Sequence, residues 1–162
     1  MNRVLLRSIE VPLPAWARAA KSFVLKVLDS QDLKNLEVSI LFCSNSYIKS
    51  LNAQYRNKDE PTDVLSFPMN EILGKAVSGR GRGRRTGPEP AGDIVISLDA
   101  LEENVRFFKV SRDEELRRLL VHGILHLSGE DHATNDAEEP MLKTQEKILA
   151  ALAGERIQEH TP

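Results

Sequence analysis

Three histidines at fixed spacing place the strongest constraint on how this chain can fold. The stretch HGILHLSGEDH occupies residues 122–132, and leucine, isoleucine and valine fill most other positions from Leu116 to Leu127. A helix that is apolar on most sides must be covered by other elements. We therefore expect a nearly buried helix whose histidine edge alone is left open.

The spacing of the histidines predicts a metal site. His122 and His126 are four residues apart, which places both imidazoles on one helix face with Cβ atoms about 5–6 Å apart. Gly129 is a natural end for that helix, because glycine adopts the left-handed C-cap conformation at little cost. The chain can then turn, and His132 can swing back as a third ligand. The alternative interpretation is a set of structural histidines, which this spacing on a capped apolar helix does not favour.

Three imidazoles suit one zinc ion per chain and leave a fourth position for water, as in catalytic zinc sites. Zinc lowers the pKa of a bound water to about 7. Metzincin proteases share this spacing but carry a glutamate base after the first histidine, where this chain has Gly123. A peptidase is therefore the weaker hypothesis. Glu130 and Asp131 are candidate proton carriers, and Asp131 is expected either to support a histidine ligand or to cap the loop.

Local patterns predict an α+β fold, with a single small mixed β-sheet packed with helices and the metal-binding histidine helix in the core. Ser44 is expected as a helix N-cap, and Ser111 with Glu114 has the form of a capping box. One domain is expected over residues 1–162, with a flexible Arg/Gly-rich loop at about 73–91 and a frayed tail at about 155–162. We expect four strands, at 3–10, 36–42, 64–67 and 93–97. We expect helices at about 14–28, 44–55, 98–108, 111–128 and 141–153. The first of these helices has a proline in its first turn.

Composition and charge limit the partners and the cellular compartment that we expect for the protein. Lysine and arginine number 22 against 24 aspartates and glutamates, a net charge of −2, which is not the basic balance of a DNA-packing protein. The single cysteine, Cys43, excludes an intrachain disulfide and suits a reducing compartment. Apolar runs are too short for a signal-peptide core or a membrane span. We expect a cytoplasmic protein with no membrane partner.

A second group of candidate functional residues contains Arg56 and the motif PTDVLSFP at residues 61–68, which follows it closely. An arginine at this place can hold a phosphate bidentately and stabilise charge on a phosphoryl group. The alternative is a surface ion pair with Asp59 or Glu60, and spacing alone favours it.

Together, YR at 55–56, PTDVLSFP at 61–68, GDIVIS at 92–97 and the histidine motif closely resemble the YbeY family of bacterial ribosomal RNA maturation endoribonucleases. The resemblance covers about residues 51–132. It implies a single-strand-specific, metal-dependent endoribonuclease that acts in 16S rRNA 3′-end maturation, ribosome biogenesis and 70S ribosome quality control. It also implies zinc on His122, His126 and His132, with catalytic roles for Arg56 and His126.

The same resemblance implies that ribosomal RNA and the small ribosomal subunit are partners, with ribosomal proteins or other RNases as further candidates. Two features depart from the family. Glu130 stands where a tyrosine or another ring is frequent, and the loop from about Gly74 to Pro90 is longer and richer in arginine than usual. Neither departure interrupts the spacing of the three histidines.

An RNA substrate makes the net charge of −2 unfavourable, because phosphate contacts supply most nonspecific affinity. Arg80, Arg82, Arg84 and Arg85, with Lys75, are expected to form a cationic arm that binds single strands, and a solvated linker is the equal alternative. The nucleophile, water or the RNA 2′-hydroxyl, stays open. Two other hypotheses remain: a metal-dependent hydrolase of another substrate, and a non-catalytic ribosome-associated zinc module.

Overall fold

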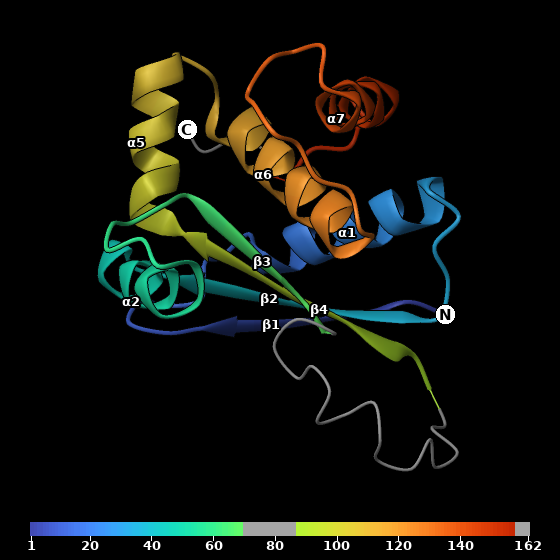
Figure 1. The fold of residues 1–162 in the computed structure, drawn as a ribbon. Helices are drawn as coiled ribbons and strands as arrows, with labels where there is room; N and C mark the ends of the chain where they lie inside the picture. Colours follow the sequence, from blue (N-terminus) through green and yellow to red (C-terminus); the bar gives the residue numbers. More distant parts are fainter. Residues whose placement is uncertain (70–86, 158–162) are drawn as a thin grey trace.

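The computed structural model describes residues 1–69 and 87–157. Its four strands form one sheet in the order β1-β2-β4-β3, in which β1, β2 and β4 are parallel and β3 is antiparallel to β4 (Figure 1). This arrangement confirms the predicted α+β fold with a small mixed sheet. The elements are β1 (Arg3–Ser8), α1 (Ala17–Ser30), β2 (Leu36–Cys43), α2 (Asn45–Arg56), β3 (Val64–Pro68), β4 (Glu89–Ser97), α5 (Leu98–Phe108), α6 (Arg112–Leu127) and α7 (Pro140–Ala151).

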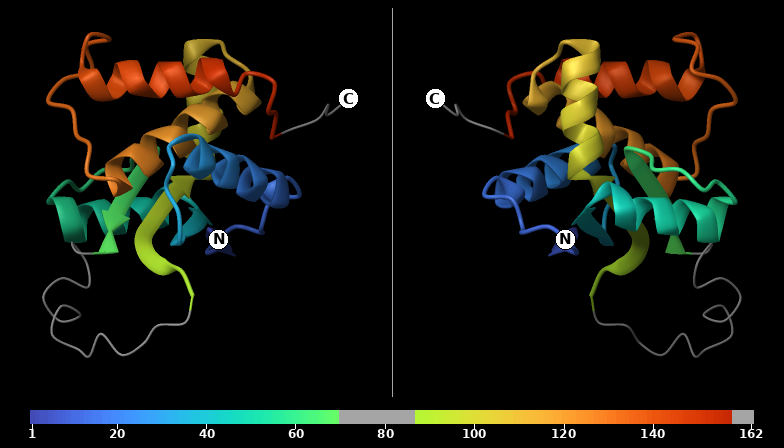
Figure 2. Two further views of the ribbon diagram at one scale, coloured as in Figure 1. Left: turned by 90° about the vertical axis from the view of Figure 1, so that its right-hand side faces the viewer. Right: turned by 90° about the vertical axis from the view of Figure 1, so that its left-hand side faces the viewer.

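Alternating side chains divide the core into two layers, one on each face of the sheet. On β2, Val38, Ile40 and Phe42 pack with residues of α1 and α6, whereas Leu41 and Cys43 pack with residues of α2 on the opposite face. Successive strand residues point to opposite faces, so this apolar strand must be covered on both sides. The larger layer holds α1 and α6, and α7 stacks on α6 away from the sheet (Figure 2).

Helix α6 is the central helix of the larger layer and contacts β3, β4, α1, α5 and α7. Its N-cap is Ser111, whose hydroxyl accepts a hydrogen bond from the backbone N–H of Glu114 at 3.1 Å, as the capping box predicts. Its C-cap is Ser128, and Gly129 follows with a φ of 97°. The left-handed glycine ends the helix and turns the chain, which confirms the predicted stop.

Gly123 lets α6 approach β4 closely. A Cβ atom at this position would lie 2.9 Å from Cγ2 of Ile94, a side chain that is fully buried in the larger layer. Packing against the sheet therefore explains a glycine in the middle of the helix, where it costs about 1 kcal/mol relative to alanine.

The first two elements differ from the sequence-based prediction at their boundaries. Strand β1 ends at Ser8 rather than at residue 10, because Glu10 takes a left-handed backbone with a φ of 61°. Helix α1 begins at Ala17 with Trp16 as its N-cap, so Pro14 lies before the first turn. The carbonyl of Pro14 accepts a hydrogen bond from the backbone N–H of Ala17 at 3.0 Å.

Strand β4 begins at Glu89, inside the segment expected as a loop over 73–91. Pro90 is tolerated there because β3 pairs with β4 only from Gly92 to Ile96, and because the pairing with β2 shifts register next to Glu37. A proline lacks the N–H of a ladder bond and is accommodated at such irregular or edge positions. Residues 73–86 of the expected loop lie outside the described residues.

The beginning of the expected frayed tail is instead packed against the core. Ile157 is only 2% exposed, and its backbone N–H donates to Oδ1 of Asp113 at 2.6 Å. Glu155 forms an ion pair with Lys26 of α1. Glu155 and Ile157 are therefore held against the rest of the fold, and the remainder of the tail after Ile157 lies outside the described residues.

Alanine at position 123 should lower the free energy of unfolding by up to about 2 kcal/mol, because overpacking against Ile94 costs about 1–3 kcal/mol and replacing a mid-helix glycine returns only about 1 kcal/mol. Urea unfolding measures the change. Gly154→Ala is the matched control, because a Cβ there would meet nothing within 4 Å, and it should change stability by less than about 0.5 kcal/mol. A Gly123→Ala protein as stable as wild type would show that this contact does not limit the distance between α6 and β4.

Candidate metal centre

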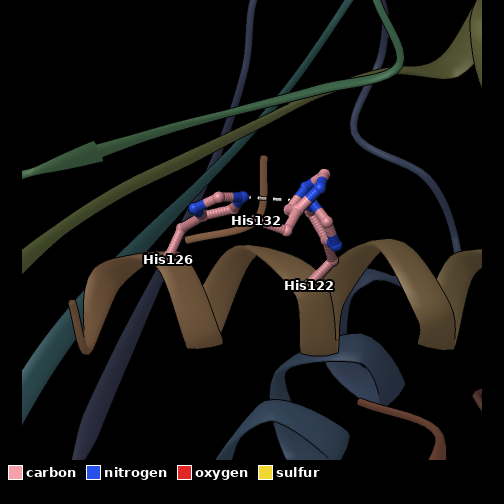
Figure 3. Close-up of side chains that lie close together, drawn as sticks. All are labelled: His122, His126 and His132. Carbon is pink, nitrogen blue, oxygen red and sulfur yellow. Dashed lines mark hydrogen bonds between the residues drawn. The ribbon is translucent and has the colours of Figure 1, made fainter. Parts of the chain in front are cut away.

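Helix α6 and the loop that follows it bring three imidazole rings together. His122 and His126 project from one face of the helix, and His132 returns from the loop to meet them (Figure 3). One ring nitrogen from each histidine lies within 4.8 Å of the other two, and the Nε2 atoms of His122 and His126 are 3.1 Å apart. The structure thus confirms that the three histidines cluster.

The Nε2 atoms of His122 and His126, 3.1 Å apart, have nearly the separation of two ligands on one metal ion. A tetrahedral site with Zn–N bonds of about 2.0–2.1 Å separates its nitrogen ligands by about 3.3–3.4 Å. Nδ1 of His122 lies 2.7 Å from Oε1 of Gln145, and Nδ1 of His132 lies 2.8 Å from the carbonyl oxygen of Thr134. Each oxygen accepts the Nδ1 proton, which leaves the Nε2 lone pair of that ring for a metal.

Gln145 and Thr134 are the site residues that the sequence analysis did not identify. Gln145 is buried in α7 on the same face as Met141 and Ile148, which belong to the core. A polar side chain at an inward position of an amphipathic helix needs a partner, and this was the available signal. Thr134 acts through its backbone carbonyl, which no side-chain pattern reveals.

The rings on α6 are held in the neutral form that metal binding requires. Burial is the main cause that lowers the pKa of His122, and the nearby His132 ring adds to it against the opposing effects of Gln145 and Asp63. Burial likewise lowers the pKa of His126, helped by the two neighbouring imidazoles. Both shifts favour the unprotonated ring.

Asp131 is placed as a loop cap. Its Oδ1 accepts a hydrogen bond from the backbone N–H of His132 at 2.8 Å, which is one of its two expected roles. Its negative charge also opposes the lowering of the pKa of His126. Asp131 and Glu130 both line the cleft beside the histidines.

This cleft has a volume of about 470 Å³ and lies between α6 and the edge strand β3. Arg56, the last residue of α2, lines it together with His122 and His126. The Nη2 atom of Arg56 donates to the carbonyl oxygen of Ser66 at 3.0 Å, and its Cζ lies 5.0 Å from the centre of the Phe67 ring. The structure thus brings the predicted arginine and two of the predicted metal ligands into one cleft.

Four other predicted site residues, Arg80, Arg82, Arg84 and Arg85, lie outside the described residues. Their expected role in RNA binding stays a prediction.

Three clustered imidazoles, two of which share a cleft with an arginine, are the donor set of a centre for metal-assisted hydrolysis. A family model described as endoribonuclease YbeY matches residues 6–153. A protein named endoribonuclease YbeY from Treponema denticola is 48% identical over 130 residues, covering 80% of this chain and 79% of the relative. This chain belongs to the endoribonuclease YbeY family, as its motifs indicate.

Two further proteins are similar to this chain over most of its length. A protein of the same name from Borrelia turicatae is 44% identical over 150 residues, covering 87% of this chain and 95% of the relative. The solution structure of a Thermotoga maritima protein is similar with a TM-score of 0.58 and 25% identity, covering 98% of this chain and 97% of that one. The similarity therefore extends well beyond the sequence motifs.

Removing the amide of Gln145 should weaken metal binding. Gln145→Leu leaves the Nδ1 of His122 without its acceptor, and we expect the Kd for zinc to rise about 10- to 100-fold. Competition with a chromophoric chelator measures this affinity, and circular dichroism checks the fold. Gln145→Glu keeps an oxygen acceptor and should bind zinc at least as tightly as wild type. Equal affinities of the leucine variant and wild type would show that Gln145 only fills space.

Proposed function

We propose that this endoribonuclease cleaves single-stranded RNA with one zinc ion held by His122, His126 and His132. We further propose that it acts in 16S rRNA 3′-end maturation, ribosome biogenesis and 70S ribosome quality control. The observation that carries the chemistry is the convergence of three imidazole nitrogens, two of them from rings that line one cleft with Arg56. Family membership supports the ribosomal RNA substrate.

The histidines and Arg56 have different roles in this cleft. The three imidazoles would hold the ion, and a bound zinc would supply Lewis-acid chemistry at neutral pH. Arg56 offers its guanidinium N–H groups to the phosphate and stabilises the negative charge that develops there. Because this guanidinium lies against Phe67 and donates to Ser66, less of its conformational freedom is lost when a phosphate binds.

The packing of α6 argues against a peptidase. The glutamate base of metzincin proteases occupies the position after the first histidine, which is Gly123 here. This position faces Ile94 of β4, and a Cβ there would already be too close to that side chain. A base at position 123 is therefore incompatible with the way α6 packs on the sheet.

The proposed partners are ribosomal RNA and the small ribosomal subunit, with ribosomal proteins or other RNases as additional partners, in the cytoplasm. Within residues 1–69 and 87–157, no helix has the length and apolar character needed to span a bilayer.

Purified protein should cleave a single-stranded fragment from the 3′ end of 16S rRNA and leave the same sequence intact in a duplex. His126→Ala should abolish cleavage and reduce the zinc content, which elemental analysis measures.

Arg56→Ala should lower kcat about 10²- to 10³-fold with zinc content unchanged, because it removes a donor to the developing charge. Arg106→Ala, at an exposed arginine of α5, is the matched control.

Equal cleavage by wild type and a folded His126→Ala variant would indicate a contaminating nuclease and would contradict the proposal. A lack of cleavage by both proteins would favour a ribosome-associated module in which zinc is structural.

The arginines at 80, 82, 84 and 85 are proposed to bind the RNA backbone. Deleting residues 79–85 should weaken binding of single-stranded RNA and flatten its salt dependence, by about 0.7 in the logarithmic slope for each phosphate that the protein no longer neutralises. Fluorescence anisotropy at increasing salt measures both effects. Replacing the four arginines by glutamine keeps the length of the segment and should have the same effect. An unchanged slope in both variants would favour a linker without a role in binding.

A further inference from the structure

A second and larger cleft, of about 840 Å³, opens on the other side of the metal centre. It is lined by residues of α5, α6 and α7 and by the segment from Lys58 to Val64. Helices α5 and α7 lie on either side of α6 (Figure 1). His122 lines both clefts and His132 lines this one, so the two clefts adjoin at the candidate metal ligands.

Phe108 presents an aromatic ring to this cleft. It is the last residue of α5, lines the cleft and is 57% exposed. Lys109 follows in a left-handed conformation with a φ of 54°, and the turn brings Val110 to the cleft as well. Phe107 is 80% exposed and packs edge-to-face on Phe108, with ring centres 5.0 Å apart. An aromatic ring left in water beside a substrate site is suited to stacking.

The charges that line the second cleft are balanced, which favours a neutral group over a phosphate in its interior. The carboxylates of Asp63 and Glu115 line it together with the ammonium group of the exposed Lys58. Arg118 lines it too, but its guanidinium already pairs with Glu146 at 3.1 Å and lies 3.7 Å from Glu114. The first cleft, in contrast, contains Arg56. The two clefts therefore differ in the part of a nucleotide that each can accept.

We propose that the second cleft is a nucleobase subsite, in which an unpaired base of the RNA strand stacks on Phe108 while the adjoining phosphate lies at the histidines. The inference rests on the proposed function and specifies how the substrate is held. Unpaired bases can be splayed out and stacked on aromatic side chains, whereas bases in a duplex are not available for this. The exposed Lys58 on the lining of the same cleft provides a cation for a neighbouring phosphate. The subsite thus gives a physical origin for selectivity toward single strands.

The test compares Phe108→Ala with Phe107→Ala in the zinc-loaded full chain. Binding of a labelled 2′-O-methyl RNA single strand, whose 2′-oxygen cannot act as a nucleophile, is measured by fluorescence anisotropy, and gel electrophoresis checks that water has not cleaved the strand. Phe108→Ala should raise the Kd about tenfold, since stacking on an aromatic side chain contributes this order of affinity per base. Phe107→Ala, which removes the same ring one residue away, should leave the Kd within about twofold. Phe108→Trp should retain binding.

A set of strands with one abasic position each identifies the contact itself. One abasic position should weaken binding to wild type about tenfold and should have no further effect on Phe108→Ala. Equal losses in the two alanine variants, or an abasic effect that persists in Phe108→Ala, would overturn the subsite. A wild type that neither binds nor cleaves single strands would overturn the proposed function. A wild type that cleaves but shows no abasic effect would overturn the subsite alone.

Discussion

The contact between Gly123 and Ile94 determines how the rest of the site is arranged. Because the helix has no side chain at this point, α6 lies directly on β4, and its histidine face turns toward the edge strand β3. The Ser66 hydroxyl then reaches the carbonyl of Gly123 at 3.4 Å, and α7 covers α6 from outside so that Gln145 meets His122. The separate segments of the site are therefore positioned by one close approach of helix and sheet.

The parts of the site that depend on local geometry could be predicted from the sequence. His122 and His126 share a helix face at any i, i+4 spacing, and Gly129 marks where the chain turns back toward His132. Gln145 and Phe108 could not be assigned in this way. They reach the site through the packing of α7 and α5 on α6, and nothing in the histidine motif specifies where those helices lie.

The fold was predicted best where an element follows from its own periodicity, and worst where tertiary contacts override local signals. Proline marks a loop in sequence, yet Pro90 lies in β4 because β3 does not extend that far. Residues near a chain end are expected to fray, yet Ile157 fills the core and donates to Asp113. Spacing alone favoured a surface ion pair for Arg56. Its contacts with Ser66 and Phe67 come instead from a neighbouring strand ten and eleven positions further along.

All three candidate ligands are imidazoles, which bind a metal as neutral rings, and the Gln145 amide and the Thr134 carbonyl that orient two of them carry no charge. A divalent ion held by neutral donors keeps both positive charges, whereas thiolate or carboxylate ligands would compensate them. In a chain of net charge −2, a bound divalent ion would be a concentrated local attraction for a polyanion. By thermodynamic reciprocity, a polyanion bound beside the ion would raise the affinity of the histidines for the ion by the same factor. Metal occupancy and substrate occupancy thus become linked properties of one site.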